Sequence, residues 1–174
     1  MAEPALSYIS HEQFVADVHA VARQLEAGDW RPDFLVGVGR GGLVPAAYLS
    51  HRVGIAMLSV DHSSGEPGFA DELLAKLAAK IEAGGHILIV DDINDSGGTI
   101  AYLRRAIEER VGADSDRLRI AVLVNNIRSR ARVEYHSRVI DRSVDKRWFV
   151  FPWEAMQSAD TLVVEAVAVP ERLA

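Results

Sequence analysis

The sequence predicts an open, mostly parallel α/β sheet flanked by helices. Short aliphatic runs typical of buried strands alternate along the chain with stretches whose apolar residues recur at helical spacing. Two of the predicted strands run directly into glycine-rich turns, at 39–42 and 94–99. Parallel strands joined by right-handed crossovers bring such turns to one edge of the sheet, where ligands bind. We also expect a small C-terminal hood segment.

The composition indicates a single domain covering residues 1–174. This length can bury one sizeable core, and 49% hydrophobic and 25% charged residues are ordinary for a globular protein. The absence of cysteine excludes a disulfide framework and any thiolate nucleophile or metal site. The N-terminus lacks the pattern of a secretion signal, and no apolar run is long enough to span a membrane. We therefore expect a cytoplasmic protein without a membrane partner.

A helix, a strand and a second helix are predicted in the first 52 residues. Ser10–Gln13 has the form of a capping box, and Gly28 is a typical helix end. Between them, apolar residues recur at helical spacing. Phe34–Val38 is expected as a short buried strand that runs into the turn 39–42, and Leu43–Arg52 as a helix. Free backbone N–H groups and the guanidinium of Arg40 at this turn could bind a second group of phosphates.

The next predicted elements are a strand over Ile55–Val60, a loop over Asp61–Gly68 and a helix over Asp71–Ala83. The loop is rich in glycine and serine, and it lies between a strand and a helix. This composition and position are typical of loops that form mobile lids.

Residues 86–100 carry the strongest functional signal. Ile87–Val90 is an aliphatic run typical of a strand buried on both faces, and Asp91 and Asp92 follow it. The turn 94–99 contains only short polar side chains and glycine, and a helix is expected over Ile100–Val111. Glycine lets the backbone approach a ligand, and a helix start offers unpaired N–H groups. The turn is therefore predicted to bind phosphate, although its spacing is neither that of a Walker loop nor G-x-G-x-x-G.

The acidic pair suggests more than a phosphate cradle. Two carboxylates beside a bound phosphate repel it, and ribose hydroxyls and Mg²⁺ would offset that repulsion. The alternative is an aspartate pair and a glycine-rich turn that bind no ligand at all.

The second half of the chain contains a further predicted strand and a block rich in arginine. The strand covers Leu118–Val124 and is followed by Asn125 and Asn126, and Thr161–Val169 is expected as an added strand. Residues 117–147 hold nine basic and three acidic side chains. A polyanionic substrate or RNA could use this block, but a solvated or subunit-contacting face is the interpretation we favour. The net charge of −6 also argues against general nucleic-acid binding.

The stretch Asp91–Thr99 resembles the 5-phosphoribosyl-1-diphosphate (PRPP) signature of type I phosphoribosyltransferases. The resemblance extends over residues ~30–155 and implies that family's fold, with a PRPP-binding core at about 30–125 and a base-binding segment at about 125–155. It implies a Mg²⁺-dependent transfer of phosphoribose to a purine base in nucleotide salvage, by a homodimer or homotetramer. Asp91 and Asp92 are then expected to bind Mg²⁺ and the ribose hydroxyls, with Asp95 as general acid/base.

The remaining PRPP-binding residues are carried over position by position from the resemblance. The turn 39–42 matches the pyrophosphate loop, in which Arg40 also stabilises the leaving diphosphate. The expected PRPP-binding residues are Gly39, Arg40, Gly41, Gly42, Asp91, Asp92, Asn94, Asp95, Ser96, Gly97, Gly98 and Thr99.

The stretch Trp148–Glu154 resembles the base-binding segment of xanthine-guanine and archaeal purine enzymes. Trp148 is expected to stack on the base and the backbone carbonyl of Phe149 to meet it, while Phe151 and Trp153 pack. The family's lysine for the 6-oxygen is missing near Asn125, and Lys146 is the only lysine in the second half of the chain. Asn125, Asn126, Arg128 or Lys146 is therefore expected to donate to the 6-oxygen instead. Because an amide is a weaker donor than a cation, we expect 6-oxopurines as substrates, with weak discrimination against adenine.

Two other functional classes fit parts of the sequence. One is a regulatory protein that keeps the fold and binds nucleotide or RNA without turnover, through its arginine-rich block. The other is a receiver-type α/β domain, which also carries acidic residues after a strand. Asp95 and Arg40 argue against the first, and the two glycine-rich turns argue against the second.

Overall fold

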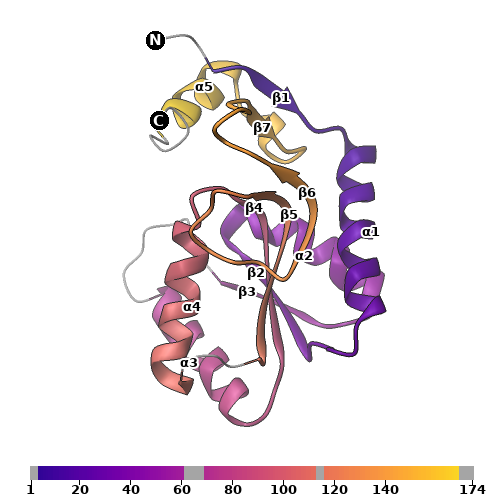
Figure 1. The fold of residues 1–174 in the computed structure, drawn as a ribbon, viewed down its shortest axis with the longest axis vertical. Coiled ribbons are helices and arrows are strands. Elements are labelled where there is room, and N and C mark those ends of the chain that lie inside the picture. The colour runs from indigo at the N-terminus through magenta and orange to yellow at the C-terminus, as the bar shows by residue number, and fades with distance from the viewer. Residues whose placement is uncertain (1–3, 61–68, 113–115, 169–174) are drawn as a thin grey trace.

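A five-stranded parallel sheet forms the centre of the molecule, which is seen here in a computed structural model that describes residues 4–60, 69–112 and 116–168 (Figure 1). Its strand order is β3-β2-β4-β5-β6, and every neighbouring pair is parallel. The strands are β2 (Phe34–Val38), β3 (Met57–Val60), β4 (Ile87–Asn94), β5 (Leu118–Asn126) and β6 (Tyr135–Ile140). The predicted fold class is therefore confirmed.

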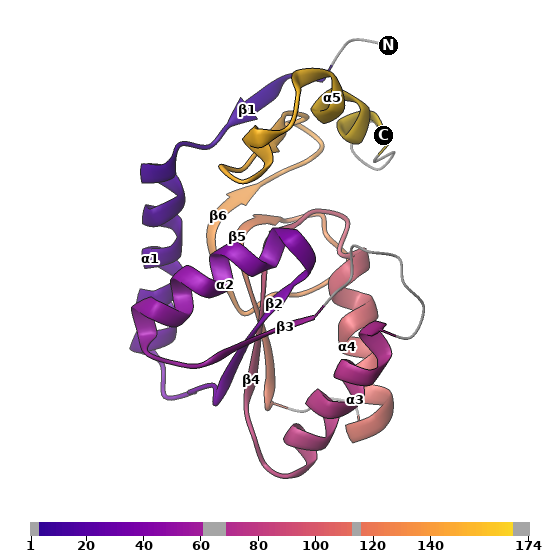
Figure 2. The same cartoon turned by 180° about the vertical axis from the view of Figure 1, so that it is seen from behind.

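Helices cover both faces of this sheet, and Figure 2 shows the same arrangement from behind. The helices are α1 (His11–Ala27), α2 (Gly39–Val53), α3 (Phe69–Glu82), α4 (Gly98–Val111) and α5 (Ala159–Val167). Among the described residues, no helix is long and apolar enough to cross a membrane.

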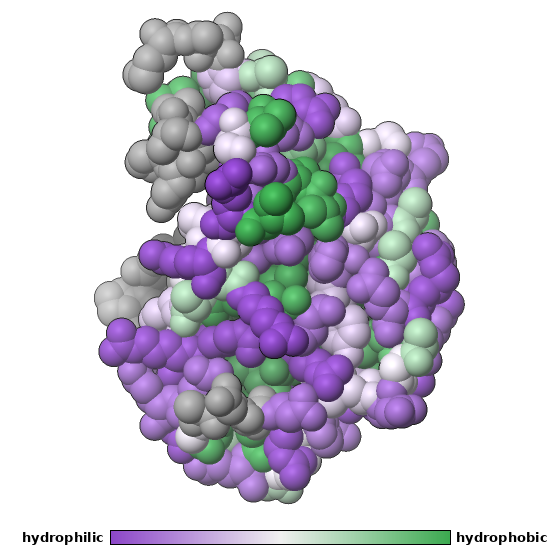
Figure 3. Space-filling view, in the orientation of Figure 1, coloured by the Kyte–Doolittle hydropathy of each residue, from purple (hydrophilic) through white to green (hydrophobic). Residues whose placement is uncertain are grey.

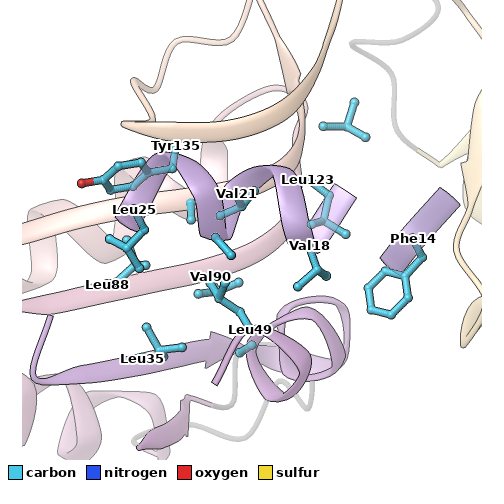
Figure 4. Close-up of a cluster of buried hydrophobic side chains, with 14 of the residues drawn as sticks. Phe14, Val18, Val21, Leu25, Leu35, Leu49, Leu88, Val90, Leu123 and Tyr135 are labelled. Atoms are coloured by element: carbon cyan, nitrogen blue, oxygen red, sulfur yellow. The ribbon is translucent and has the colours of Figure 1, made fainter. Parts of the chain in front are cut away.

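Alternating side chains of the central strands divide between two hydrophobic clusters. In β4, Leu88 and Val90 belong to a cluster with residues of α1 and α2, such as Val18 and Leu49 (Figure 4). Their neighbours Ile87 and Ile89 belong to a second cluster with residues of α3 and α4. Successive residues of a strand point to opposite faces. The continuous aliphatic run in β4 is thus explained by burial on both faces.

A small second layer lies above the carboxyl ends of the strands. Its two-stranded parallel sheet pairs β1 (Leu6–Tyr8) with β7 (Trp148–Val150), and a 3₁₀ turn at Glu154–Met156 and α5 follow. Phe149 and Phe151 belong to the same cluster as the core residues of α1, so this layer is packed onto the main domain. We call residues 145–168 the hood.

The first helix begins and ends as expected. The side chain of Ser10 accepts a hydrogen bond from the backbone N–H of Gln13, and Gly28 follows the last helical residue. The helix is also held to β6 by an ion pair between buried Asp17 and Arg138, at 3.0 Å.

Several predicted boundaries differ from the structure. The second helix begins at Gly39 rather than Leu43, because the first N–H groups of a helix need no internal partner and glycine can adopt the required turn. The strand β4 continues through both aspartates to Asn94, and β5 includes Asn125 and Asn126. The strands β1 and β6 were not predicted.

The strand predicted over Thr161–Val169 is wrong over its described part, because Ala159–Val167 form a helix. Ser158 caps this helix by accepting a hydrogen bond from the N–H of Thr161. Leu162 and Ala166, four residues apart on one face, are fully buried.

Most of the surface is hydrophilic, but one group of hydrophobic side chains lies beneath the hood in the view of Figure 3. Large hydrophobic residues that are exposed near this end of the sheet include Ile127, Val139 and Val144.

Candidate active site

The two glycine-rich turns meet at the carboxyl end of β4. A Cβ atom built on Gly42 would lie 2.2 Å from the carbonyl oxygen of Val90, and one on Gly41 would lie 2.5 Å from Oδ2 of Asp92. A side chain at Gly42 would force the backbone of β4 to shift, and one at Gly41 would displace the Asp92 carboxylate. The start of α2 is therefore in direct contact with the end of the strand that carries the acidic pair, as the sequence predicted.

The acidic pair forms a carboxylate cluster with Glu154 of the hood. Burial raises the pKa of Asp91 to about 7, opposed by the N–H of Asp92, which donates to its Oδ1 at 3.0 Å. Burial and the charges of Asp91 and Glu154 raise the pKa of Asp92 well above its usual range. Both aspartates keep partial solvent exposure, so a ligand can reach them.

The hood reaches the first glycine-rich turn through Glu154. Its Oε2 accepts a hydrogen bond from the backbone N–H of Phe151 at 2.9 Å. Burial raises the pKa of Glu154, whereas the nearby charge of Arg40 lowers it. Sequence reasoning missed this residue as part of the site, although it ends the aromatic stretch that was singled out.

The acidic pair suits a hard divalent cation. Adjacent carboxylates that share a partly desolvated site favour a cation, because it removes the cost of holding two negative charges together. Among the described residues, no three His, Cys, Asp or Glu side chains are grouped as metal ligands. A Mg²⁺ ion here would need oxygen atoms from substrate and water to complete its coordination, as Mg²⁺ commonly does.

The second glycine-rich turn is held from behind by residues 129–131. The buried side chain of Asn94 donates to Asn125 Oδ1 at 2.8 Å and to the carbonyl of Ala131 at 2.9 Å. Its Oδ1 accepts from the hydroxyl of Ser129 at 2.7 Å. Asn94 and Asn125 thus brace the turn. Asn125, which the sequence predicted as a hydrogen-bond donor to the base, already accepts from Asn94 through its side-chain oxygen.

Gly97 precedes α4 in the left-handed conformation, with φ +84°. A Cβ atom there would lie 2.5 Å from Ser129 Oγ and 2.7 Å from the amide nitrogen of Ala131. Both the backbone angle and the close packing therefore require glycine. The helix begins at Gly98, whose N–H is directed to the Ser96 hydroxyl at 3.3 Å.

Asp95 is paired with Arg142, a buried arginine from the loop between β6 and β7. The guanidinium Nε and Nη2 atoms donate to Asp95 Oδ1 and Oδ2 at 2.8 and 2.9 Å. Its Nη1 atom donates to the carbonyls of Asp145 and Arg147, at 3.2 and 2.6 Å. This residue connects the predicted phosphate turn to the start of the hood, and sequence reasoning did not single it out as a site residue.

Two aromatic rings of the hood pack against each other. Phe151 is buried and stacks on Trp153 at 5.0 Å between ring centroids, which confirms the prediction that these two rings pack. Phe149 is also buried, with the guanidinium groups of Arg138, Arg142 and Arg147 at 5.2–5.8 Å from its ring centroid. Trp148 is half-buried in β7, beside the carbonyl that Arg142 holds.

A cavity of about 430 Å³ opens beside Asp95. Its lining residues are Asp95, Ser96, Asn126, Arg128, Arg130, Arg142 and Ser143. A larger cavity of about 680 Å³ lies between α4 and residues 130–135. In the larger cavity, Arg104 is paired with Glu134 and Arg119 with Asp116. The aspartates at the end of β4 do not line it, so we take the smaller cavity as part of the site.

The arginine-rich block is largely engaged within the chain. Among the described residues, its ion pairs join Arg119 to Asp116, Arg128 to Asp141, Arg132 to Glu134, Arg138 to Asp17, Arg142 to Asp95 and Arg147 to Asp145. Two of these acidic partners, Asp17 and Asp95, lie far away in the sequence, so the excess of basic residues within 117–147 overstated the unpaired charge. The predicted lid over Asp61–Gly68 lies outside the described residues.

Comparison with known proteins gives consistent matches. The family described as "Phosphoribosyl transferase domain" matches residues 5–158. The chain is 28% identical over 156 residues to a xanthine-guanine phosphoribosyltransferase of Cereibacter sphaeroides, covering 84% of this chain and 86% of that protein. It is 29% identical over 154 residues to the protein of the same name from Idiomarina loihiensis, with the same coverage.

A solved structure shows the same similarity in three dimensions. The purine phosphoribosyltransferase of Pyrococcus horikoshii superimposes with a TM-score of 0.61 and 25% sequence identity. The match covers 85% of this chain and 93% of that one.

Proposed function

Because this chain belongs to the phosphoribosyl transferase domain family, we propose that it transfers the phosphoribosyl group of PRPP to a ring nitrogen of a purine base, releasing pyrophosphate. The observation that carries this proposal is the meeting of two glycine-rich turns and an acidic pair at one strand end. A diphosphate at one turn and a 5′-phosphate at the other would place the ribose between them, beside Asp91 and Asp92.

The turn 94–99 and the start of α2 are proposed to hold the two phosphate groups. Both offer backbone N–H groups at the beginning of a helix, where the helix dipole also favours an anion. Arg40 adds a positive charge to the first turn and so stabilises the diphosphate as it gains charge on leaving.

Asp91 and Asp92 are proposed to hold the ribose hydroxyls and a Mg²⁺ ion. When bound, Mg²⁺ supplies a Lewis acid that neutralises charge on the diphosphate. The carboxylates fix the sugar so that its C1′ atom faces the base, which lowers the entropic cost of the reaction.

Asp95 is proposed to manage the proton on N7 of the base. The bidentate contact with Arg142 fixes its orientation, and the carboxylate lies on the wall of the cavity. An oriented carboxylate can accept the N7 proton as the base attacks C1′ through N9. Trp148 is proposed to stack on the ring, which stabilises any planar base by ~1–3 kcal/mol.

The test is a panel of bases incubated with PRPP and Mg²⁺ and followed by pyrophosphate release. Guanine, xanthine, hypoxanthine and adenine are compared with orotate and uracil. We expect turnover of at least one purine and none of either pyrimidine, and Asp95→Asn serves as the inactive control. Turnover of a pyrimidine alone would contradict the proposal.

We further propose that the protein is a cytoplasmic homodimer or homotetramer. Sedimentation equilibrium tests the assembly, and fractionation of the cells that produce the protein tests the location.

A further inference from the structure

Arg142 is the most completely buried cation in the described part of the chain. Arg142 is 5% exposed, whereas the nearby Arg128 and Arg147 have more than half of their side chains exposed. Burying a guanidinium is costly unless its N–H groups find acceptors. The acceptors of its five N–H groups therefore decide whether the cost of burying Arg142 is offset.

Four of the five N–H groups of Arg142 have protein acceptors. The Nε–H and one Nη2–H meet the two oxygens of Asp95, and the two Nη1–H groups meet the carbonyls of residues 145 and 147. The second Nη2–H has no acceptor among the described residues. Arg142 lines the cavity beside Asp95, so this remaining donor is available to a ligand there.

Asn126 fixes the pair from the backbone side. Its Nδ2 donates to the carbonyl of Asp95 at 3.0 Å, and its Oδ1 accepts from the amide of Arg142 at 3.2 Å. The same oxygen accepts from the amide of Arg128 at 3.1 Å. The buried amide thus holds the backbones of both members of the pair, so the pair is rigid before a ligand arrives.

The pair presents a hydrogen-bond donor directly beside a hydrogen-bond acceptor. The Nη2 atom of Arg142 and the Oδ2 atom of Asp95 are 2.9 Å apart and belong to the same wall of the site. A 6-oxopurine carries the complementary pattern, because its 6-oxygen accepts while its N7–H donates. Adenine places an amino group, which donates, at the same position and would oppose the guanidinium N–H.

We propose that Arg142 is a specificity-determining residue that binds the 6-oxygen of the base while it holds Asp95 at N7. This inference rests on the proposed function and replaces the sequence-based expectation of weak discrimination against adenine. That expectation assumed a neutral amide donor, whereas a buried cation makes a stronger hydrogen bond. A site built to bind an oxygen also rejects a base that leaves its donor unpaired.

The experiment compares two bases of which only one carries the 6-oxo group. Hypoxanthine and unsubstituted purine are assayed with PRPP in the wild-type protein and in the Arg142→Gln and Arg142→Lys variants. We expect wild type to favour hypoxanthine in kcat/KM by at least about 100-fold. Arg142→Gln should reduce that ratio by about tenfold or more, and Arg142→Lys should retain an intermediate ratio because it keeps the charge.

Arg105→Gln is the matched control, because Arg105 is exposed on α4, paired with Glu109, and lines neither of the two cavities. Its ratio of kcat/KM for hypoxanthine to kcat/KM for unsubstituted purine should equal that of wild type. PRPP affinity, measured by calorimetry, should change by less than about threefold in all three variants, because the pair is proposed to act on the base. Thermal unfolding shows the folded fraction of each variant.

A purely structural role for Arg142 gives a different result. Activity would then fall equally for both bases, with the ratio unchanged, and the inference would be overturned. If Arg142→Gln does not fold, the ratio in the charge-conserving Arg142→Lys variant decides, and a wild-type ratio there overturns the inference. If the wild-type protein converts no purine base of any kind, the proposed function itself fails.

Discussion

At the scale of single residues, the site depends on a few carboxylates whose environments differ. Asp95 is held by a buried guanidinium, while Asp91, Asp92 and Glu154 share a desolvated cluster. The first arrangement stabilises a fixed negative charge, and the second makes negative charge costly until a cation binds.

Asp95→Asn should lower kcat by roughly 10²–10⁴ while PRPP affinity remains near that of wild type. The amide keeps the shape of the side chain but cannot take a proton from N7. Steady-state kinetics and calorimetry measure the two effects, and Asp141→Asn is the control because Asp141 carries an exposed ion pair with Arg128. Loss of PRPP binding in Asp95→Asn would instead identify Asp95 as a structural residue of the turn.

The metal-free protein should lose stability as the pH rises from about 4 to 7. The pKa of Asp91 is about 7 in the folded protein and near 3.8 for the free side chain, so the folded state binds more protons in this range. Stability from this group is therefore complete below its unfolded pKa and is lost as the pH passes through the folded pKa.

Urea unfolding midpoints across this pH range, in the presence of a chelator, measure that loss. The Asp91→Asn, Asp92→Asn double variant should show a flatter profile than wild type, because it lacks the titrating pair. An identical slope in the two proteins would show that this cluster does not set the pH dependence.

The sequence predicted the residues of the two turns because their chemistry is local. Asp91, Asp92 and the glycines lie within a few residues of the strand or helix that positions them. Arg142 could not be found this way, since its partner Asp95 lies 47 residues earlier and the pair forms only after β6 is in place. Pairing across the fold also explains why the arginine-rich block was read as a mostly solvated face.

At the scale of elements, two glycines at helix ends offer a test of why the second turn needs glycine. Gly97 before α4 and Gly54 after α2 both adopt the left-handed conformation, with φ +84° and ψ +7° for Gly97 and φ +71° and ψ +25° for Gly54. A Cβ atom on Gly97 would collide with Ser129 and Ala131, whereas one on Gly54 would meet no described atom within 4 Å. The two positions therefore share a left-handed backbone and differ in packing.

Gly54→Ala should cost about 1–2 kcal/mol of unfolding free energy, which is the usual cost of a left-handed alanine. Gly97→Ala should cost more and should also raise the KM for PRPP, because the turn must move away from residues 129–131. Urea unfolding and steady-state kinetics measure both effects. Equal costs with an unchanged KM would mean that the close packing behind the turn is unimportant.

Element boundaries show where local pattern was insufficient. The β-branched run in residues 161–167 favours a strand, but the Ser158 cap and the burial of Leu162 and Ala166 select a helix. The strands β1 and β6 are short or contain many polar residues, so neither has a strong strand pattern of its own. Their position is fixed by pairing with β7 and β5.

At the scale of the whole molecule, ligand binding should be visible as added stability. PRPP together with Mg²⁺ should raise the melting temperature, because a ligand at 100 times its Kd adds about 2.7 kcal/mol to the folded state. Calorimetric melting with PRPP alone, Mg²⁺ alone and both measures the effect. Equal stabilisation by PRPP in the presence of a chelator would contradict the proposed role of the acidic pair.

The fold class was predictable at this scale because strand and helix patterns alternate regularly through residues 34–124. The hood was expected only from a short aromatic stretch, and its partner strand was not. Leu6–Tyr8 has no distinguishing pattern, and it forms a sheet only because Trp148–Val150 lies beside it.

The pairing of β1 with β7 has a consequence for the order in which the protein forms during its synthesis. The paired residues Leu6 and Trp148 are 142 positions apart, and contacts between distant residues form late in folding. At the usual rate of translation, β7 leaves the ribosome roughly one to five seconds after β5 is complete. A growing chain therefore passes through a stage at which both proposed phosphate turns have been synthesised, while Trp148, the proposed stacking residue for the base, has not.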